Sequence, residues 1–269
     1  MVRAPAVAGR FYPGEPDILK TLVADLLVTH ATAEPQSAIA VLVPHAGYVY
    51  SGGVAAAVYS AVRIPARVIL LGPNHTGLGP PLSLWDRGIW EFPGGEVRVD
   101  EEFGHLLRKS CPELVPDPLA HRYEHCLEVQ IPFLEARVEH LRVTPVVLGT
   151  SRLETLHQLG HAIAEAVRQA GEAALVVISS DMTHYEPAEV AARKDHLAVE
   201  AMEAMDAEGL HQVVVREEIS MCGFAPAVAG LAAARELGAR SGRLVRYAHS
   251  GVVSGDNTSV VGYAGMVFS

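Results

Sequence analysis

The sequence predicts an α/β fold with a central, mostly parallel or mixed sheet covered by helices on both faces. Short apolar runs bounded by turn residues are typical of buried strands, and here they alternate with longer segments of helical periodicity. Three of the runs, VLVPH, VILLGPNH and LVVISSDMTH, lead to a histidine at or just beyond the strand end. Because the carboxyl ends of parallel strands lie along one edge of a sheet, we expect the functional site there.

Composition favours a single domain, which we expect to span residues 1–269. Hydrophobic residues make up 49% of the chain and charged residues 19%, so a sizeable core can be buried. No apolar run approaches the roughly 18 residues of a membrane span, and the first residues lack the apolar stretch of a secretory signal. We therefore expect no membrane association.

Net charge and cysteine content indicate which partners and which redox compartment we expect for the protein. The formal net charge is −10, and no patch rich in Lys and Arg with interleaved aromatic residues occurs, which argues against a nucleic-acid partner. The three cysteines are an odd number and widely spaced, which is not a disulfide framework. This usage fits a reducing cytoplasm.

Individual elements follow from local patterns along the chain. Pro16 and Asp17 open the first predicted helix, Ser51 is expected to cap the second, and acidic residues at 100–102 favour the start of the third. The Pro-Gly-Gly sequence at 93–95 predicts a hairpin over residues 90–99. The predicted helices are 17–27, 52–62, 100–110, 153–170, 187–207 and 225–237. Strands are predicted before His45 and His75 and over 143–148, 174–179, 244–248 and 260–268.

The segment 124–139, EHCLEVQIPFLEARVE, has apolar residues at helical spacing but carries Pro132 inside it. Proline predicts either a kink or a late helix start. On a continuous helix, His125 and Glu128 would share one face. They would then line the pocket, bind a residue that supports a ligand, or form a solvated pair.

His45 and His75 are the strongest candidates for metal ligands, since neutral imidazole is a common ligand for iron, zinc and copper. The alternative is that both satisfy backbone groups of their loops. Cys222 precedes a helix, where the helix dipole is expected to lower the pKa of a thiol. It would complete a His/His/Cys metal site or act as a nucleophile, unless it is a small buried apolar residue.

Asp181 and His184 stand three residues apart in SSDMTH, directly after a buried strand. This spacing allows the carboxylate to orient the imidazole, and a positioned histidine of near-neutral pKa is a natural general acid or base. The alternative is a turn held by an Asx hydrogen bond.

Several stretches together resemble the Memo family (mediator of cell motility), whose bacterial and archaeal members are called AmmeMemoRadiSam system protein B. The matching stretches are AVAGRFYPG, VPHAGYVYSG, LLGPNHTG, EHCLEVQIPFL, SSDMTHY, CGFAPAVAGL and SGDNTSVVGYAGMVF, in this order from about Arg3 to the last residue. The family is similar in fold to the LigB-like class III extradiol dioxygenases, a non-haem iron group. The resemblance implies a LigB-like α/β fold with its site at the strand carboxyl ends.

The resemblance also implies roles for residues. His45 and His75 fall where the dioxygenases place two histidine iron ligands, and Cys222 falls where they place a carboxylate. His184 falls at their acid/base histidine, with Asp181 beside it. A thiolate in place of a carboxylate makes a softer site that also suits copper or zinc, with iron(II) still the first expectation.

Three functional hypotheses follow. The leading one is a metalloprotein that carries out oxidative chemistry on an unknown small substrate, with Phe11, Tyr12, Tyr48, Asn74, His125 and Glu128 as candidate pocket residues. The second is a binding module whose cleft holds a peptide or partner protein. The third is hydrolysis with Cys222 as nucleophile and His184 as base. The prokaryotic family name further suggests a functional link to a radical-SAM protein and an AMMECR-like domain protein.

Overall fold

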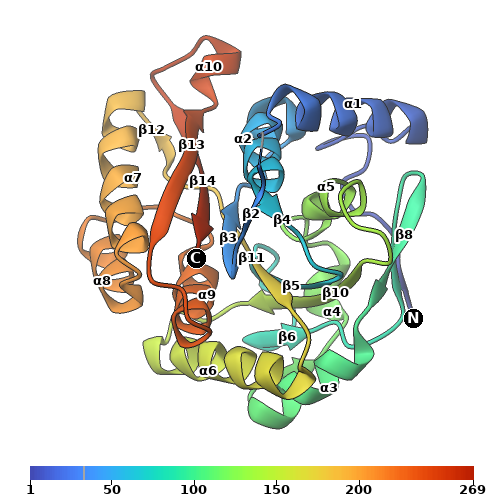
Figure 1. The fold of residues 1–269 in the computed structure, drawn as a ribbon. Coiled ribbons are helices and arrows are strands. Elements are labelled where there is room, and N and C mark those ends of the chain that lie inside the picture. Colours follow the sequence, from blue (N-terminus) through green and yellow to red (C-terminus); the bar gives the residue numbers. More distant parts are fainter. Residues whose placement is uncertain (33) are drawn as a thin grey trace.

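A computed structural model of the chain, which describes residues 1–32 and 34–269, confirms the predicted α/β class. One mixed sheet runs through the molecule, with the strand order β1-β7-β8-β10-β5-β11-β3-β14-β12. β13 pairs with β14, and the short strands β6 and β9 attach beside β10. The elements are labelled in Figure 1.

Four parallel strands form the centre of the sheet: β10 (Arg142–Leu148), β5 (Arg67–Pro73), β11 (Ala174–Ser179) and β3 (Ala40–Val43). They are buried over nearly their whole length because helices cover both of their faces. β14 (Val260–Phe268) runs antiparallel to β3, which makes the sheet mixed. The predicted hairpin at 90–99 is confirmed as β7 (Ile89–Phe92) and β8 (Gly95–Val99). The remaining strands are β1 (Val2–Arg3), β2 (Gln36–Ser37), β4 (Val62–Arg63), β6 (Leu82–Leu84), β9 (Val115–Pro116), β12 (His184–Glu186) and β13 (Gly242–His249).

Alternate residues of the central strands pack into two apolar layers, as the two-residue period of a strand requires. On one side lie α1 (Pro16–Thr29), α2 (Tyr48–Ala61) and α5 (Ile131–Glu135) (Figure 1). On the other lie α3 (Glu101–Ser110), α6 (Leu153–Ala170), α7 (Ala188–Glu203), α8 (Ala207–Arg216) and α9 (Phe224–Glu236). The shorter helices are α4 (Leu119–Arg122), a 3₁₀ turn (Glu128–Gln130) and α10 (Gly251–Ser254).

One local prediction was wrong, and one of two predicted alternatives is confirmed. Ser51 does not cap the second helix, because α2 begins at Tyr48 with Gly47 before it, and the Ser51 hydroxyl donates to the carbonyl of Ala46. The helix expected over 124–139 is confined to α5, after a single 3₁₀ turn. Pro132 lies at its second position, where a missing N–H costs no helical hydrogen bond, so the late start is the alternative that the chain adopts.

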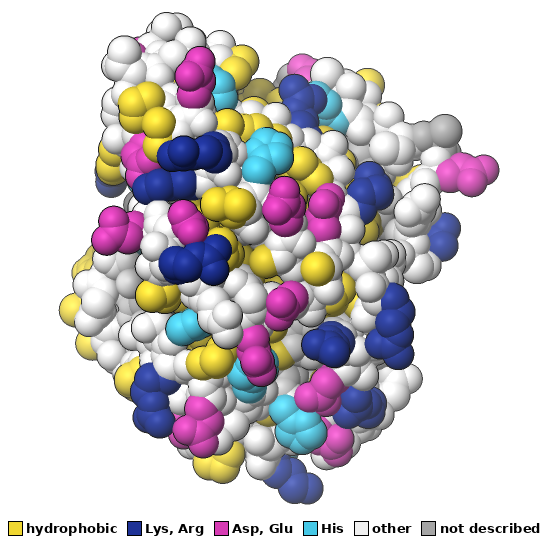
Figure 2. Space-filling model, turned by 90° about the vertical axis from the view of Figure 1, so that its left-hand side faces the viewer, with side chains coloured by type: hydrophobic (Ala, Val, Ile, Leu, Met, Phe, Trp, Pro, Cys, Tyr) yellow, Lys and Arg dark blue, Asp and Glu magenta, His cyan; other side chains and the backbone are white. Residues whose placement is uncertain are grey.

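The face of the molecule that carries α7 and α8 mixes acidic, basic and hydrophobic side chains without a large area of one kind (Figure 2). Among the helices of residues 1–32 and 34–269, none is long and apolar enough to cross a membrane.

Candidate metal centre

The carboxyl ends of β3, β5 and β11 lie side by side, as the sheet order β5-β11-β3 requires. His45 and His75 each stand two residues past the last residue of their strand, and Asp181 stands two past Ser179. The imidazole rings of His45 and His75 have centroids 5.2 Å apart. The predicted edge of the sheet therefore gathers the two histidines that the sequence placed there.

A third imidazole joins them. The ring of His125 lies 4.7 Å from that of His75 and 5.4 Å from that of His45, measured between centroids. One ring nitrogen from each of the three falls within 4.8 Å of the others. His125 reaches this place because residues 124–127 form an irregular turn, so it does not share a helix face with Glu128 as a continuous helix would require.

Cys222 approaches the cluster from the loop before α9. Its Sγ lies 3.2 Å from Nε2 of His45, close to the roughly 3.5 Å that separates ligand atoms around a four-coordinate ion. Within the described part of the chain, the ligand sets in which all atoms lie within 4.8 Å of one another are His45-His75-His125 and His75-Glu124-Cys126, and neither contains Cys222. The thiol therefore contacts one member of the cluster, His45.

The imidazole of His45 is held by a buried serine. Ser179 donates its hydroxyl hydrogen to the carbonyl of Cys126 at 2.7 Å, so its oxygen accepts from Nδ1 of His45 at 2.9 Å. This arrangement puts the proton of His45 on Nδ1 and leaves a lone pair on Nε2, which faces the Cys222 thiol. Burial, followed by the charge of His75, lowers the pKa of His45 to about 3, so the ring is neutral at physiological pH.

Glu124 holds the second histidine. Its carboxylate accepts from Nδ1 of His75 at 2.8 Å and from the backbone N–H of His75 at 2.6 Å. Burial acts against the charged form of His75, but the hydrogen bond and charge of Glu124 outweigh it and raise the pKa of His75 above 6.5. A carboxylate on the far nitrogen of a histidine is the support that metal-ligating imidazoles usually have. Sequence reasoning missed Glu124, and its place beside His125 was the available signal.

The same carboxylate also steadies the loop of the third histidine. Glu124 accepts the backbone N–H groups of His125 and Cys126, and its Oε1 lies 3.4 Å from Nδ1 of His125. Burial, then the neighbouring His45, lowers the pKa of His125 to about 4. Burial alone would raise the pKa of Glu124, but the hydrogen bond from His75 brings it down to about 2. At neutral pH the centre therefore combines an ionised carboxylate with neutral His45 and His125.

The expectation of a lowered thiol pKa at Cys222 was wrong. Burial, followed by the charge of Asp181, raises the pKa of the Cys222 thiol well above its ordinary value. The helix dipole is outweighed because the sulfur is removed from water and stands beside a carboxylate. The thiol contacts His45 and the backbone of Asp181, at the N–H and the carbonyl, and not the His184 imidazole that a Cys-His nucleophile would need.

Asp181 does not orient His184 by a hydrogen bond, contrary to the expectation. Its Oδ1 accepts the backbone N–H of His45 at 2.7 Å. Nδ1 of His184 instead donates to the carbonyl of Ser220 at 2.9 Å. The segment from Asp181 to His184 leads into strand β12 and is not helical, so residues three apart do not share a face.

Four of the predicted pocket residues lie in different surroundings and make different contacts. Phe11 is half-buried with its ring 4.8 Å from that of His125. Tyr12 is buried and donates to Glu128, and Tyr48 is buried and donates to the carbonyl of Val129. Asn74 braces its own loop by donating to the carbonyl of Leu78 and accepting from the N–H of Thr76.

Glu128 is fully engaged in anchoring the start of the chain. Its carboxylate pairs with Arg3 at 2.7 Å and accepts the backbone N–H groups of Ala6 and Val7. Arg3, Val7 and Glu128 are buried and Ala6 is half-buried, so Glu128 fixes the segment that carries Phe11 to the side of His125.

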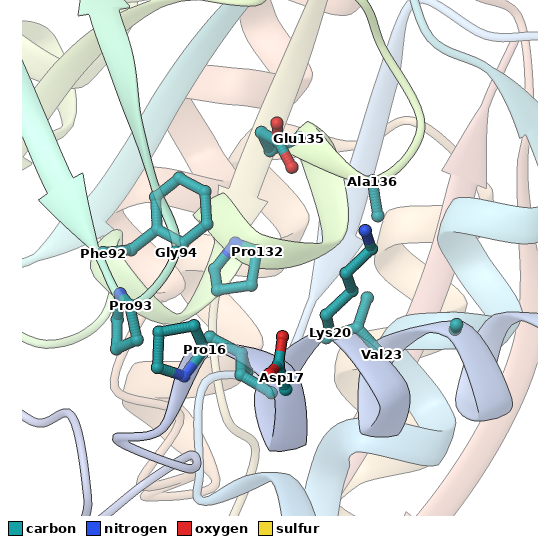
Figure 3. Close-up of a pocket in the computed structure, with 12 residues that line it drawn as sticks. Pro16, Asp17, Lys20, Val23, Phe92, Pro93, Gly94, Pro132, Glu135 and Ala136 are labelled. Atoms are coloured by element: carbon teal, nitrogen blue, oxygen red, sulfur yellow. The ribbon is translucent and has the colours of Figure 1, made fainter.

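A separate groove of about 450 Å³ lies between the start of α1, the tip of the β7–β8 hairpin and α5. Figure 3 shows Phe92, Pro16 and Pro132 on its walls, with Lys20 reaching from α1 toward Ala136. None of the histidines or cysteines described above lines this groove.

Fold and site thus define an α/β protein with a histidine- and cysteine-bearing centre at the carboxyl edge of its parallel strands. The chain belongs to the Memo family: the family described as Memo-like protein matches residues 3–267. It is 46% identical over 269 residues to the MEMO1 family protein of Aquifex aeolicus, covering 99% of each chain. MEMO1 family proteins of Methanopyrus kandleri and Methanocaldococcus jannaschii are 40% and 39% identical, each over at least 98% of both chains.

Proposed function

We propose that this protein is a metal-dependent enzyme with redox or oxygenase-type chemistry, in which His45, His75 and Cys222 hold one metal ion. Iron(II) is the first expectation, and copper or zinc would suit the same donors. The observation that carries the proposal is the convergence of three imidazoles at the sheet edge, with nitrogens within 4.8 Å of one another.

The donor set fits a metal. His45 and His75 are each held through Nδ1, by Ser179 and Glu124, so Nε2 of each is the nitrogen left for an ion. The geometry also adds His125 as a further candidate ligand. When bound, the metal would supply Lewis-acid and redox chemistry that side chains alone do not have.

The protein's own groups would position and deprotonate the substrate. His184 donates through Nδ1 to Ser220, so Nε2 is its proton acceptor, suited to take a proton from a substrate hydroxyl. Asp181 is buried and aligns the backbone of His45. Phe11 offers an aromatic surface beside His125, which favours a small substrate with a planar, electron-rich group.

Metal analysis of protein purified without oxygen tests the proposal. We expect one equivalent of metal in the wild-type protein and a loss of most of it in His45→Ala and in Cys222→Ala. His161→Ala is the matched control, since His161 is exposed on α6 and pairs with Glu236, which is not a residue of the centre. Unchanged metal content in both site variants would end the proposal, and an X-ray absorption edge would identify the bound element.

A further inference from the structure

A carboxylate outside the metal centre is buried on the inner face of α7. Asp195 is 0% exposed and shares the core-facing side of the helix with Ala191, Ala198 and Val199. A charged residue in an apolar stripe is rare unless its oxygens are fully hydrogen-bonded. The hydrogen-bond partners of Asp195 therefore indicate which part of the structure its carboxylate holds in place.

Asp195 reaches the backbone just before His184. Its Oδ1 accepts the N–H of Thr183 at 2.9 Å, and its Oδ2 accepts the hydroxyl of Tyr247 at 2.7 Å. Gly262 of β14 makes room for this reach, because a Cβ at that position would lie 2.0 Å from Oδ2. Two strands and a helix are thus arranged around one carboxylate.

The residues that follow Thr183 are in a conformation that needs such support. Tyr185 has φ of +60°, in the left-handed region that an aromatic residue rarely adopts, and the pairing of β12 with β14 is irregular at this point. α7 holds the strand a second time, since Lys194 pairs with Glu186 at 2.6 Å. A strained backbone persists only where the surroundings determine it, and here α7 fixes both sides of it.

His184 lies between these two points. Its backbone N–H donates to the hydroxyl of Ser220 at 2.7 Å, and its Nδ1 donates to the carbonyl of Ser220. A carbonyl only accepts, so the neutral ring carries its proton on Nδ1. Both bonds to Ser220 require the backbone of His184 to stay where Thr183 sets it.

We propose that Asp195 is a positioning residue: by holding the N–H of Thr183, it fixes the His184 imidazole as the Nδ1–H tautomer with Nε2 free to accept a proton. The catalytic meaning of this inference rests on the proposed function, in which His184 moves protons. The positioning itself is a property of the protein without metal or substrate.

Nitrogen-15 NMR of the His184 ring in metal-free protein at about pH 8 tests the proposal. We expect Nδ1–H in the wild-type protein and a shift to mostly Nε2–H in Asp195→Ala. Asp195→Asn should retain Nδ1–H, because its amide oxygen still accepts from Thr183. Tyr247→Phe is the matched control, since it removes the other hydrogen bond of Asp195 and leaves the Thr183 bond in place.

Nδ1–H in Asp195→Ala, or Nε2–H in the wild-type protein, would overturn the proposal. If Asp195→Ala does not fold, the double variant Asp195→Ala/Tyr247→Phe replaces it, because it also removes the Tyr247 hydroxyl that would lose its acceptor. Metal content is measured on the same samples. Loss of the proposed function would appear as absent metal in the wild-type protein, whereas failure of the positioning role appears only in the ring tautomer.

Discussion

The sulfur of Cys222 lies 3.2 Å from Nε2 of His45, although 177 positions separate the two residues in the chain. The contact joins the loop before α9 to the loop after β3, and the imidazole nitrogen is oriented by Ser179 from β11. The thiol proton therefore lies between Sγ and the lone pair of Nε2. A metal ion bound by both atoms would displace this proton.

This contact predicts a pH dependence of metal affinity. The raised pKa of Cys222 means that binding must displace the thiol proton, whereas His45 and His125, with pKa values of about 3 and 4, are already neutral. Between about pH 7 and 8.5 we expect affinity to rise about tenfold per pH unit. In Cys222→Ala the affinity should be lower and should rise less steeply over the same range, because only His75, whose pKa is raised, still loses a proton on binding. Competition titrations with a chelator measure both slopes, and equal slopes would remove Cys222 from the ligand set.

Glu124→Gln should weaken metal binding about 10- to 100-fold, the usual effect of losing the carboxylate behind a ligating histidine. Glu124 accepts from four donors, the Nδ1 and N–H of His75 and the N–H groups of His125 and Cys126, and an amide cannot accept from all of them. Glu135→Gln is the control, because Glu135 is an exposed carboxylate from the same segment of the chain. Equal affinity of the two variants, measured by calorimetry, would contradict the role of Glu124.

His121 predicts a loss of stability in acid. It is fully buried, its Nε2 donates to the carbonyl of Ser83 and its Nδ1 has no hydrogen-bond partner among the described residues. Burial, then the charge of Arg3, lowers the pKa of His121 from 6.5 to about 3. Between pH 6.5 and about pH 3, His121 is protonated in the unfolded chain but neutral in the native protein. The contribution of His121 to the free energy of unfolding is therefore fully present above pH 6.5 and decreases as the pH falls.

At pH 5 the cost from His121 is on the order of 2 kcal/mol. His121→Gln keeps a donor to Ser83 and removes the titration, so its free energy of unfolding should fall less steeply with acid. Urea unfolding at several pH values between 7.5 and 5 gives the comparison. Parallel curves for the two proteins would show that His121 does not titrate on unfolding.

Gly160→Ala should destabilise the protein by about 1–3 kcal/mol, because a Cβ there would lie 2.6 Å from Cβ of Ala232 and 2.7 Å from the carbonyl of Ala229. This clash lies between α6 and α9. Gly104→Ala in α3 is the control, since its Cβ would have only ordinary contacts at 3.6 Å or more, and it should be neutral or stabilising by about 0.5–1 kcal/mol. Thermal unfolding measures the midpoints of the two variants. Similar midpoints would show that α6 and α9 can move apart without a loss of stability.

The parts of the site that could be predicted from sequence are those fixed by the sheet. His45 and His75 follow buried strands, and parallel pairing alone brings such positions together. The residues that hold these histidines in place depend on backbone and side-chain rotations. The spacing of residues in the sequence does not predict these rotations. Glu124 and His125 reach the centre through an irregular turn, and Ser220 replaces Asp181 as the partner of His184 because that segment is not helical. Tertiary packing decides these positions, and a single sequence does not record it.

β3 pairs residues 40–42 with residues 266–268 of β14, so the strand that leads to His45 gains its second neighbour from nearly the opposite end of the chain. Closing so long a loop is entropically expensive before the contacts form. Refolding of this protein is therefore expected to be slow, and while β3 lacks this partner its exposed edge is the surface on which two molecules would first aggregate.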